Sequence, residues 1–372
     1  MAALPPELVE EILLRLPPDD PASLFRAALV CRLWRRLASG TGFRRRFCEF
    51  HHHTAPVLGV LCQGQNHDSN NEQDRLPKAC FFSTSSFRPA RVDHHGCCVI
   101  DARHGRVLLS RVTPKAGPWR IDLIVWDPTT DEQLELPSLP IHGTWKAAVV
   151  CAAGSSCDHI DCHRGSFLVV VVFIGIEPRR MFTLVYASDA RAWSEVASVE
   201  RQYLCDYFEI APGVLLADAF YFLACHSNGI VKYDMVTRKI SMINLMICNF
   251  SHQNNVLMTM EDGRLGLATM KAVRNRCQPI HLWSMEVGSD TDARFVLSGV
   301  IDLEKLLPIK VFEVFRVNGF ADGARVLFIS TTDGLYSIDI KSEQVKKIDL
   351  NSYLLGGNPV YRSNALEHII CY

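Results

Sequence analysis

Gly105-Arg106-Val107-Leu108-Leu109 and Trp126-Asp127-Pro128-Thr129-Thr130 together form a pattern that recurs along most of this sequence. A glycine precedes an apolar strand, and a second strand ends in an aromatic or aliphatic residue followed by Asp or Ser and a polar turn. The further copies start and end at Gly165 and Tyr186, Gly213 and Tyr233, Gly263 and Trp283, and Gly323 and Ile338. The five strand ends are separated by 60, 47, 50 and 55 residues, so the period averages 53.

A period of about 50 residues with about four short strands in each repeat is typical of a kelch-like β-propeller. Five repeats, with one more shared by the two ends of the domain, predict about six blades. We therefore expect a β-propeller over residues 81–372, and a linker and entry to the β domain over residues 51–80. The polar stretch 62–78 favours a loop within that entry.

The first fifty residues follow a helical pattern. Apolar residues at Leu8, Ile12, Leu13 and Leu16 fit one face of a helix that Pro17 and Pro18 end. A second start is predicted where Asp20 would cap a helix that begins with Pro21. The apolar set that follows is broad and indicates two short helices with a bend near Cys31, and a last amphipathic piece covers residues 43–50. We expect a small three-helix module that completes its core against a partner, because fifty residues bury little surface alone.

Two motifs in this module carry a resemblance to a known family. Residues 4–17, from Leu4-Pro5 to the second Leu-Pro at Leu16-Pro17, resemble the opening of the F-box motif. Val30-Cys31-Arg32-Leu33-Trp34 with Leu37 resembles its closing half, at the family's spacing. The match covers residues 4–50, so the expected F-box domain is residues 1–50.

The resemblance implies that the module docks onto a Skp-type adaptor, which bridges to a cullin scaffold. Some of the docking residues must also hold the helices together, and the sequence does not separate the two roles. Leu13, Leu33 and Leu37 are better interpreted as core residues. Carried over by position, the adaptor-binding surface would draw on Leu4, Pro5, Leu8, Ile12, Leu16, Leu24, Val30 and Trp34.

The second half also resembles a known partner of the F-box. Trp126-Asp127-Pro128 followed by Leu136-Pro137, then Tyr186 with Trp193-Ser194, and later segments through 218–223 and 282–303, are similar in order to the F-box-associated β domain of large plant families. Each motif is loose by itself, and their order over most of the domain carries the resemblance.

Composition and charge exclude several classes of protein. With 39 basic and 40 acidic residues the formal net charge is -1, which gives no electrostatic reason to expect nucleic acid or an anionic membrane as partner. The start at Met1 lacks the basic and apolar regions of a secretory signal, and the longest apolar run, residues 167–176, is about half of the ~20 residues that cross a bilayer. The 14 scattered cysteines fit small buried side chains in a reducing compartment, so we expect a cytoplasmic or nuclear protein.

Candidate chemical sites are few, and no catalytic residue, cofactor or metal site is expected. No nucleophile elbow, His-Glu-x-x-His motif or phosphate-binding glycine loop is found in the sequence. His51-His52-His53 is interpreted as a solvated junction. Cys151, Cys157, His159, Cys162 and His163 could suggest zinc, but their spacing lacks paired Cys-x-x-Cys knuckles, so a variable loop between blades is preferred. The arginines at 32, 35, 36 and 44–46 lack interleaved aromatic residues and favour a solvated face or a surface for an acidic partner.

The sequence therefore predicts a protein that is not an enzyme. We expect the substrate-recognition subunit of a Skp-cullin-F-box ubiquitin ligase, which binds the adaptor through its N-terminal module and an unknown target protein through the propeller. Two alternatives remain open. One is a propeller-based scaffold acting outside a ligase, and the other is a propeller enzyme, which would need charged or metal-binding residues at the propeller axis.

Overall fold

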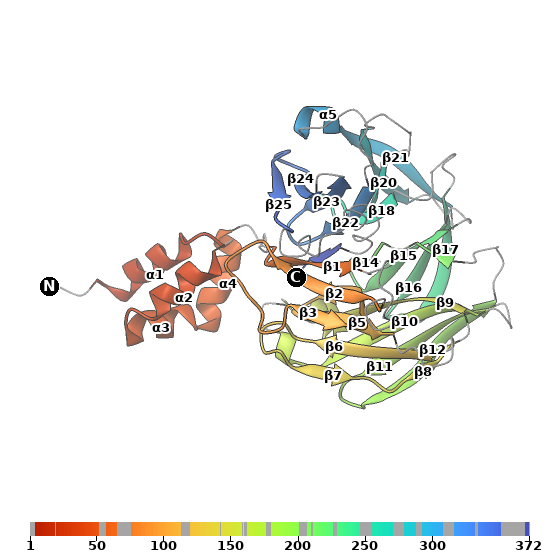
Figure 1. Cartoon of the computed structure of the whole chain (residues 1–372), viewed down its shortest axis with the longest axis horizontal. Helices are drawn as coiled ribbons and strands as arrows, with labels where there is room; N and C mark the ends of the chain where they lie inside the picture. Colours follow the sequence, from red (N-terminus) through yellow and green to blue (C-terminus); the bar gives the residue numbers. More distant parts are fainter. Residues whose placement is uncertain are drawn as a thin grey trace.

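A small helical lobe projects from one side of a larger ring of β-sheets (Figure 1). The chain is described here from a computed structural model. The residues that it describes are 4–18, 20–51, 57–64, 76–112, 120–141, 143–157, 159, 162–175, 180–200, 207–209, 211–225, 229–245, 255–270, 279–287, 292–307, 316–331, 334–350 and 369–371. Side chains are described in these ranges except at 21, 225, 287, 292–293 and 369–371.

The lobe contains four helices, where the sequence predicted a three-helix module. They are α1 (Pro6–Leu14), α2 (Pro21–Ala28), α3 (Arg32–Ala38) and α4 (Thr41–Phe50). The bend predicted near Cys31 separates α2 from α3, and Asp20 directly precedes the proline that begins α2. The fourth helix is separate because Gly40, with an extended backbone (φ -70°, ψ 137°), lies between α3 and α4. The last amphipathic piece thus forms a helix of its own.

The rest of the described chain forms six blades, which we number in chain order; each has four strands, with one short additional strand in blade 2 and one in blade 4. Blade 1 contains β26 (Ile369–Cys371), β1 (Gly59–Gly64), β2 (Lys78–Ser83) and β3 (Asp93–His95). Blade 2 contains β4 (Cys97–Arg103), β5 (Arg106–Arg111), β6 (Arg120–Trp126) and β7 (Gln133–Glu135), with β8 (Leu139–Pro140) beside β6. Blade 3 contains β9 (Gly143–Cys151), β10 (Phe167–Gly175), β11 (Arg180–Ala187) and β12 (Ala192–Glu200).

The remaining three blades follow in the same way. Blade 4 contains β13 (Tyr207–Phe208), β14 (Val214–Leu216), β15 (Ala219–Cys225), β16 (Gly229–Asp234) and β17 (Lys239–Leu245). Blade 5 contains β18 (Asn255–Thr259), β19 (Leu265–Met270), β20 (Ile280–Val287) and β21 (Asp292–Ile301). Blade 6, after the short helix α5 (Leu303–Leu306), contains β22 (Arg316–Ala321), β23 (Val326–Thr331), β24 (Gly334–Asp339) and β25 (Val345–Ile348). Blades 4 and 5 are also joined at their outer edges, where β17 pairs in parallel with β21.

The two ends of the β domain close the ring in one blade, as the sequence predicted. β26 pairs antiparallel with β1, and Leu61 stands opposite Ile370 in that pairing. The innermost strands neighbour one another around the ring in the order β26, β4, β9, β13 and β14, β18 and β22. Six apolar clusters fill the six contacts between adjacent blades. The core is therefore distributed between the blades, and closure by β26 completes it.

The long apolar run of the sequence is a strand buried on both faces. Successive side chains of a strand point to opposite faces. In β10, Val169 and Val171 pack in the cluster shared with blade 2, whereas Val170 and Val172 pack in the cluster shared with blade 4. All four are fully buried. No helix among the described residues has the length and apolar character needed to span a bilayer.

The five repeat anchors occupy the third strand of five successive blades. Trp126, Tyr186, Tyr233, Trp283 and Ile338 lie on β6, β11, β16, β20 and β24. Four of them are buried, and Trp283 is half-buried. The periodic signal arises because each third strand packs one large side chain against a neighbouring blade. The glycine that starts each of the other repeats precedes the second strand of its blade. Gly213 instead precedes β14, which pairs with the second strand of blade 4, so it lies one strand earlier.

The first strand of the propeller, β1, begins at Gly59, within residues 51–80, which the sequence analysis assigned to a linker and entry to the β domain. Residues 62–64 belong to β1 and residue 78 begins β2, whereas residues 65–75 lie outside the described part of the chain. The predicted loop over 62–78 was too long because β1 carries Gln63 buried, with its side-chain oxygen accepting from the Val99 amide at 3.0 Å. A buried polar side chain that is satisfied by a neighbouring strand is compatible with a core strand.

Acid should weaken this fold in part through His94. His94 is buried on β3, packs edge-on against Trp126, and burial lowers its pKa to about 4. In the unfolded chain the imidazole takes up its proton near pH 6.5. The stability that the neutral His94 contributes is therefore fully present above that pH and is lost as the pH falls towards 4. We expect the urea midpoint to fall between pH 7 and pH 4.5, and to fall less in His94→Gln. Equal pH slopes for the two chains would contradict this role.

Candidate functional site

Helix α1 is apolar on two faces that have different surroundings. Val9 and Leu13 are buried in the core of the lobe, together with Leu14 and Phe43. Leu8 and Ile12, four residues apart on the other face, are 52% and 45% exposed. Side chains four residues apart lie one above the other on a helix. The apolar set of α1 therefore combines a core face with a face that is open to a partner.

A second exposed apolar face lies at the end of α2. Phe25 and Leu29 are also four residues apart, and they are 67% and 66% exposed. Val30, which follows directly, is 64% exposed. The sequence analysis missed Phe25 and Leu29. The signal that could have found them is their spacing, which leaves them on the side of α2 opposite Leu24 and Ala27, two members of the lobe's core.

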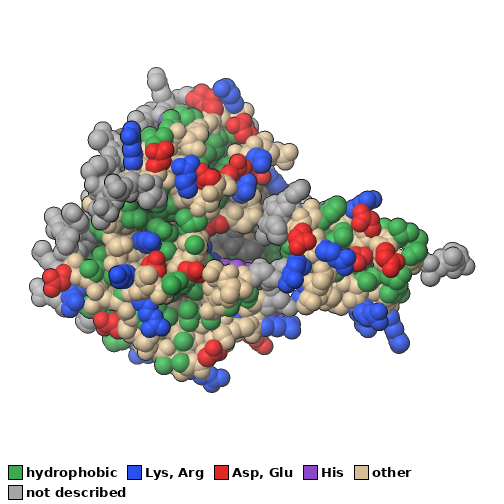
Figure 2. Space-filling view, turned by 180° about the vertical axis from the view of Figure 1, so that it is seen from behind, with side chains coloured by type: hydrophobic (Ala, Val, Ile, Leu, Met, Phe, Trp, Pro, Cys, Tyr) green, Lys and Arg blue, Asp and Glu red, His purple; other side chains and the backbone are tan. Residues whose placement is uncertain are grey.

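Exposed apolar side chains are concentrated in this lobe. Seven of the fifteen large exposed apolar side chains of the described residues lie within the first fifty residues. They are Leu4, Leu8, Ile12, Phe25, Leu29, Val30 and Phe50. Hydrophobic side chains are visible at the free end of the lobe, away from the propeller (Figure 2). Exposed apolar patches of this kind mark interaction sites. We call the first six of these residues the lobe surface.

The structure separates the eight predicted adaptor-binding residues into two groups. Leu4, Pro5, Leu8, Ile12 and Val30 are exposed. Leu16, Leu24 and Trp34 are half-buried and pack against the lobe's core. Leu13 is fully buried and Leu37 packs partly against that core, in line with the core role expected for them, and Leu33 is half-buried. These three residues therefore contribute to the packing of the lobe.

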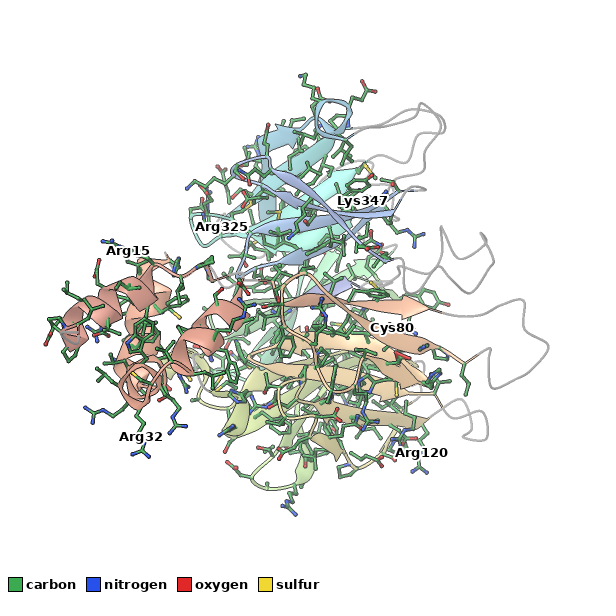
Figure 3. All side chains as sticks on the ribbon, turned by 60° about the vertical axis from the view of Figure 1, so that its left-hand side comes forward. Arg15, Arg32, Cys80, Arg120, Arg325 and Lys347 are labelled. Carbon is green, nitrogen blue, oxygen red and sulfur yellow. The ribbon has the colours of Figure 1, made fainter. Side chains whose placement is uncertain are left out.

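An ion pair joins α4 to α1, and another lies along α1. Arg46 of α4 pairs with Glu10 of α1, and Arg15 donates to Glu11 at 2.9 Å. Arg32, at the start of α3, points away from the propeller (Figure 3). His51, predicted to be a solvated junction, is half-buried, and its Nε2 lies 2.9 Å from the Leu14 carbonyl oxygen at the end of α1. His52 and His53 lie outside the described residues.

Polar contacts at the start of α2 attach the lobe to blade 1. The Asp20 carboxylate accepts from the Ser23 hydroxyl at 2.5 Å and from the Ser86 hydroxyl at 2.9 Å. These bonds hold the pKa of Asp20 below its usual value. The Ala22 amide donates to Ser86 Oγ at 3.1 Å. Ser86 follows β2, so one serine links the lobe to the ring and contributes to its orientation.

The propeller axis carries a buried charged network that the sequence analysis did not find. Asp101, 1% exposed at the end of β4, accepts from Arg103 Nε at 3.1 Å and from the Val149 amide of β9 at 3.0 Å. Arg103 also pairs with Asp322 at 3.8 Å, after β22, and donates to the Gly213 carbonyl oxygen before β14. Asp322 accepts from the Thr259 amide of β18 at 3.2 Å. These contacts connect the innermost strands of five blades.

This network has the geometry of a structural connection. Burial raises the pKa of Asp101, and the charge of Arg103 opposes that rise. Both carboxylates are engaged by the guanidinium and by backbone amides, and the Arg103 side chain itself is only 14% exposed. A catalytic carboxylate must reach its substrate. The Asp101 carboxylate is enclosed, so its pairing with Arg103 favours a role in stability.

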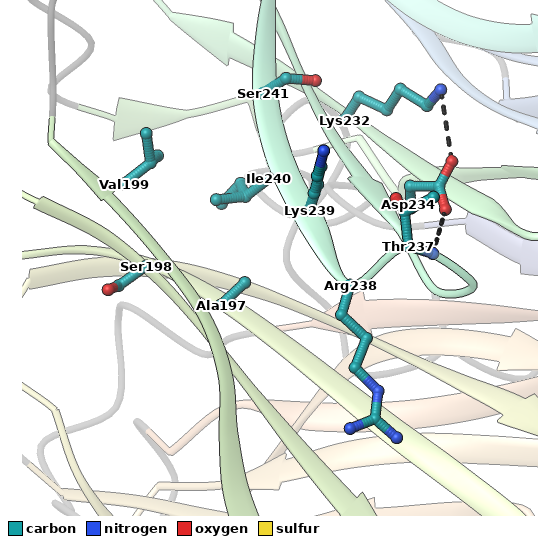
Figure 4. A pocket seen from close by; sticks show the side chains of 10 residues that line it. All are labelled: Ala197, Ser198, Val199, Lys232, Asp234, Thr237, Arg238, Lys239, Ile240 and Ser241. Atoms are coloured by element: carbon teal, nitrogen blue, oxygen red, sulfur yellow. Dashed lines mark hydrogen bonds and ion pairs between the residues drawn. The ribbon is translucent and has the colours of Figure 1, made fainter.

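One surface hollow lies at the outer edge between blades 3 and 4 (Figure 4). Its volume is about 380 Å³, and it is bounded by β12 on one side and by β16, β17 and their turn on the other. Lys232 pairs with Asp234 at 3.6 Å, and the Thr237 amide donates to the same carboxylate at 2.8 Å. Arg238 and Lys239 are exposed beside them. None of these residues was predicted as a site.

Comparison with protein families identifies the lobe. A family model described as F-box-like matches residues 1–49. Residues 1–49 are therefore an F-box-like domain, followed by a six-blade β-propeller, as the motifs predicted. A search of the curated proteins found no match to the chain.

The solved structures that resemble this chain share little sequence identity with it. The β-propeller domain of Cps50 (Swd1) from Myceliophteria thermophila is 12% identical, with a TM-score of 0.38, over 78% of this chain and 86% of that one. The α-L-arabinanase of Penicillium chrysogenum, solved with arabinobiose, is 10% identical, with a TM-score of 0.36, over 67% and 79% of the two chains. A protein from Lactobacillus plantarum is 12% identical, with a TM-score of 0.35, over 78% and 95%. Similarities at this level say nothing about what this chain binds.

Proposed function

We propose that this chain is the substrate-recognition subunit of a Skp-cullin-F-box ubiquitin ligase. The observation that carries the proposal is the lobe surface, an exposed apolar set on an F-box-like domain. F-box domains generally bind Skp-type adaptors. The adaptor would cover this surface and bridge to a cullin, and the propeller would hold the target protein.

The energetics favour binding of the lobe surface as a whole. Burying the exposed part of each of its six side chains contributes on the order of 1–2 kcal/mol, or roughly 6–12 kcal/mol in all. Association costs about 4–15 kcal/mol in lost freedom of motion. A contact that covers only α1 or only α2 would contribute about 3–6 kcal/mol, near the lower limit of that cost, which favours an adaptor that engages both faces together.

The propeller supplies a rigid ring with loops that can select a partner. Binding residues concentrate on loops that a rigid scaffold positions, and the buried network at the axis fits such a scaffold. In this role the chain performs no chemistry of its own and binds no nucleic acid or membrane. Catalysis comes from proximity, because the ligase brings a charged ubiquitin-conjugating enzyme to the target.

The type of β domain and the cellular compartment are inferred from motifs and cysteine placement in the sequence. The order of the aromatic and Asp-containing segments supports a kelch-like F-box-associated domain of the plant type. The cysteines are scattered along the chain, and no disulfide joins the nine whose side chains the structure describes, which supports a role in the cytoplasm or nucleus.

The test is reconstitution of the full chain with a purified Skp-type adaptor and cullin. We expect the three proteins to elute together in gel filtration, and the assembly to support ubiquitin transfer when the conjugating enzyme is added. Binding of the adaptor without the cullin would favour a scaffold acting outside a ligase. Failure to bind the adaptor would overturn the proposal and direct attention to the propeller as an independent binding or catalytic unit.

A further inference from the structure

Four metal-binding side chains converge in the connection between β9 and β10. Cys151 is the last residue of β9, Cys157 follows the short helix η1 (Gly154–Ser156), His159 comes two residues later, and Cys162 begins η2 (Cys162–Arg164). One ligand atom from each lies within 4.8 Å of the other three. The sequence interpretation had preferred a variable loop here, because the spacing did not contain paired knuckles. The fold brings the four side chains together, although their spacing in the sequence does not indicate it.

The arrangement is close to that of a filled tetrahedral zinc site. Zinc lies about 2.3 Å from cysteine sulfur and about 2.0–2.1 Å from histidine nitrogen, so neighbouring ligand atoms in a tetrahedron are roughly 3.3–3.8 Å apart. Cys162 Sγ and His159 Nδ1 are already 3.5 Å apart. The widest pair, at 4.8 Å, must move by about 1 Å to reach this range. Side-chain rotation on a surface connection can provide such a shift.

We propose that Cys151, Cys157, His159 and Cys162 bind one structural Zn²⁺ ion that fixes the β9–β10 connection. Three thiolates and one imidazole form a closed ligand set with no position left for water or substrate, which is the mark of a structural site. Soft sulfur ligands select zinc over hard cations such as calcium and magnesium. The site lies outside the lobe surface and adds a function that adaptor binding does not require.

The backbone at His159 adopts a conformation that is uncommon for residues other than glycine. His159 has φ 56°, in the left-handed region that costs a non-glycine residue about 1–2 kcal/mol. Its amide faces Cys157 Sγ at 3.4 Å, so the backbone donates to a prospective ligand. Strained conformations persist when the surroundings require them. A metal ion held by the side chains on either side of this turn would provide that requirement.

Residues of blade 2 support the prospective ligands from behind. The His104 ring stacks on the His159 ring at 3.8 Å with an interplanar angle of 6°. His104 Nδ1 accepts a hydrogen bond from the Cys151 amide at 3.1 Å. Such contacts orient metal ligands and are characteristic of metal sites. The ion would thereby connect the edge of blade 3 to the β4–β5 turn of blade 2.

Arg106 places a buried positive charge beside the four prospective zinc ligands. Arg106 is 3% exposed, and its Nη2 donates to the carbonyl oxygens of Cys162 at 2.8 Å and Gly165 at 2.5 Å. Its Nη1 has no hydrogen-bond partner within the described part of the chain. Zinc with three thiolates and a neutral imidazole carries a net charge of about -1. A guanidinium beside the cluster balances that charge, and a thiolate would in turn satisfy a buried cation.

Metal analysis of the full chain tests the proposal. We expect about one zinc per chain, measured by inductively coupled plasma mass spectrometry after purification with a thiol reductant and gel filtration. Cys157→Ser and His159→Asn should each lower the zinc content at least fivefold, whereas Cys98→Ser, at a half-buried cysteine on β4 outside the cluster, should retain it. Refilling the zinc-depleted chain with Co²⁺ should give the thiolate charge-transfer and intense d–d bands of tetrahedral coordination.

Three results would overturn the proposal. The first is a folded wild-type chain that contains no zinc and takes up none when zinc is supplied. The second is unchanged zinc content in Cys157→Ser and His159→Asn. The third is a disulfide among Cys151, Cys157 and Cys162 found by non-reducing peptide mapping of protein kept under reducing conditions. If a variant fails to fold, the cobalt spectrum of the wild-type chain decides the question without it.

Discussion

The double variant Leu8→Asp/Phe25→Asp should bind a Skp-type adaptor at least 100-fold more weakly than the wild-type chain, with its fold intact. Leu8 and Phe25 are more than half exposed, so a carboxylate at either position stays hydrated in the free protein. In the complex both carboxylates would be buried against an apolar partner. Burying an unpaired charge costs several kcal/mol, and a 100-fold loss corresponds to only about 2.7 kcal/mol.

Titration calorimetry with the full chain and purified adaptor measures this loss, and circular dichroism checks the fold. Val236→Asp is the matched control, because Val236 is an exposed apolar residue of the propeller, 73% exposed, in the turn after β16. The control should bind like the wild-type chain. A double variant that binds within threefold of the wild-type chain would show that the adaptor does not use the lobe surface.

The choice of residues in this test depends on what the structure adds to the motif. Trp34 and Leu8 are both motif positions, but Trp34 packs on the lobe's core whereas Leu8 does not. A substitution at Trp34 would mix loss of stability with loss of binding. The sequence could not separate the two roles because each helix of a small module is apolar on more than one side. Only the packing of α3 and α4 against Val9 and Leu13 shows which side remains open.

The propeller was predictable because its signal is periodic. In blades 2, 3, 4 and 6 the third strand carries a large buried residue at its end or one position before it, and the repeat of Trp126, Tyr186, Tyr233 and Ile338 follows from that packing. Even the blade shared by the two ends could be counted, since five repeats leave one position in the ring. The start of the ring at Gly59 could not be placed, because β1 lacks the glycine-to-aromatic pattern of the other blades.

Contacts between distant residues were beyond the sequence. Asp101 and Asp322 are more than two hundred positions apart, and nothing near either one marks it as an axis residue. The Cys151–Cys162 cluster illustrates the same limit at short range, since its spacing fits no familiar knuckle but its fold brings four ligand atoms together. Closure of the ring brings the two aspartates together, whereas the turns of one connection bring the four ligand atoms together, and the local sequence pattern indicates neither contact.

Replacing Arg103 with Met should lower the free energy of unfolding by about 3–5 kcal/mol, the range seen when one partner of a buried ion pair is removed. Methionine preserves much of the apolar stem but removes the guanidinium, whose Cζ lies 5.9 Å from the centroid of the Phe220 ring. It leaves the carboxylate of Asp101, 1% exposed, without its cation. The backbone carbonyl oxygen of Gly213 loses its donor as well. Urea denaturation of the full chain at pH 7.5 measures the change.

Arg264→Met is the matched control for this substitution. Arg264 pairs with Asp262 at 2.5 Å across the same two-residue spacing as Arg103 and Asp101, but both side chains are nearly half exposed. An exposed pair contributes little to stability because solvent screens it, so the urea midpoint of the control should stay close to that of the wild-type chain. Equal losses in the two variants would show that burial does not distinguish the pairs, and would contradict the structural role of the axis network.

The pH dependence of the Arg103→Met variant gives an independent check on the cause. Burial already raises the pKa of Asp101, and Arg103 opposes that rise. Without the arginine, the pKa of Asp101 should rise further. When the pKa of a carboxyl is higher in the folded chain than in the unfolded chain, the folded state binds the proton more strongly. The free energy of unfolding then increases as the pH falls through the pKa of the folded state. The deficit of Arg103→Met relative to the wild-type chain should therefore be smaller at pH 5 than at pH 7.5, whereas a deficit caused by lost packing alone would be the same at both.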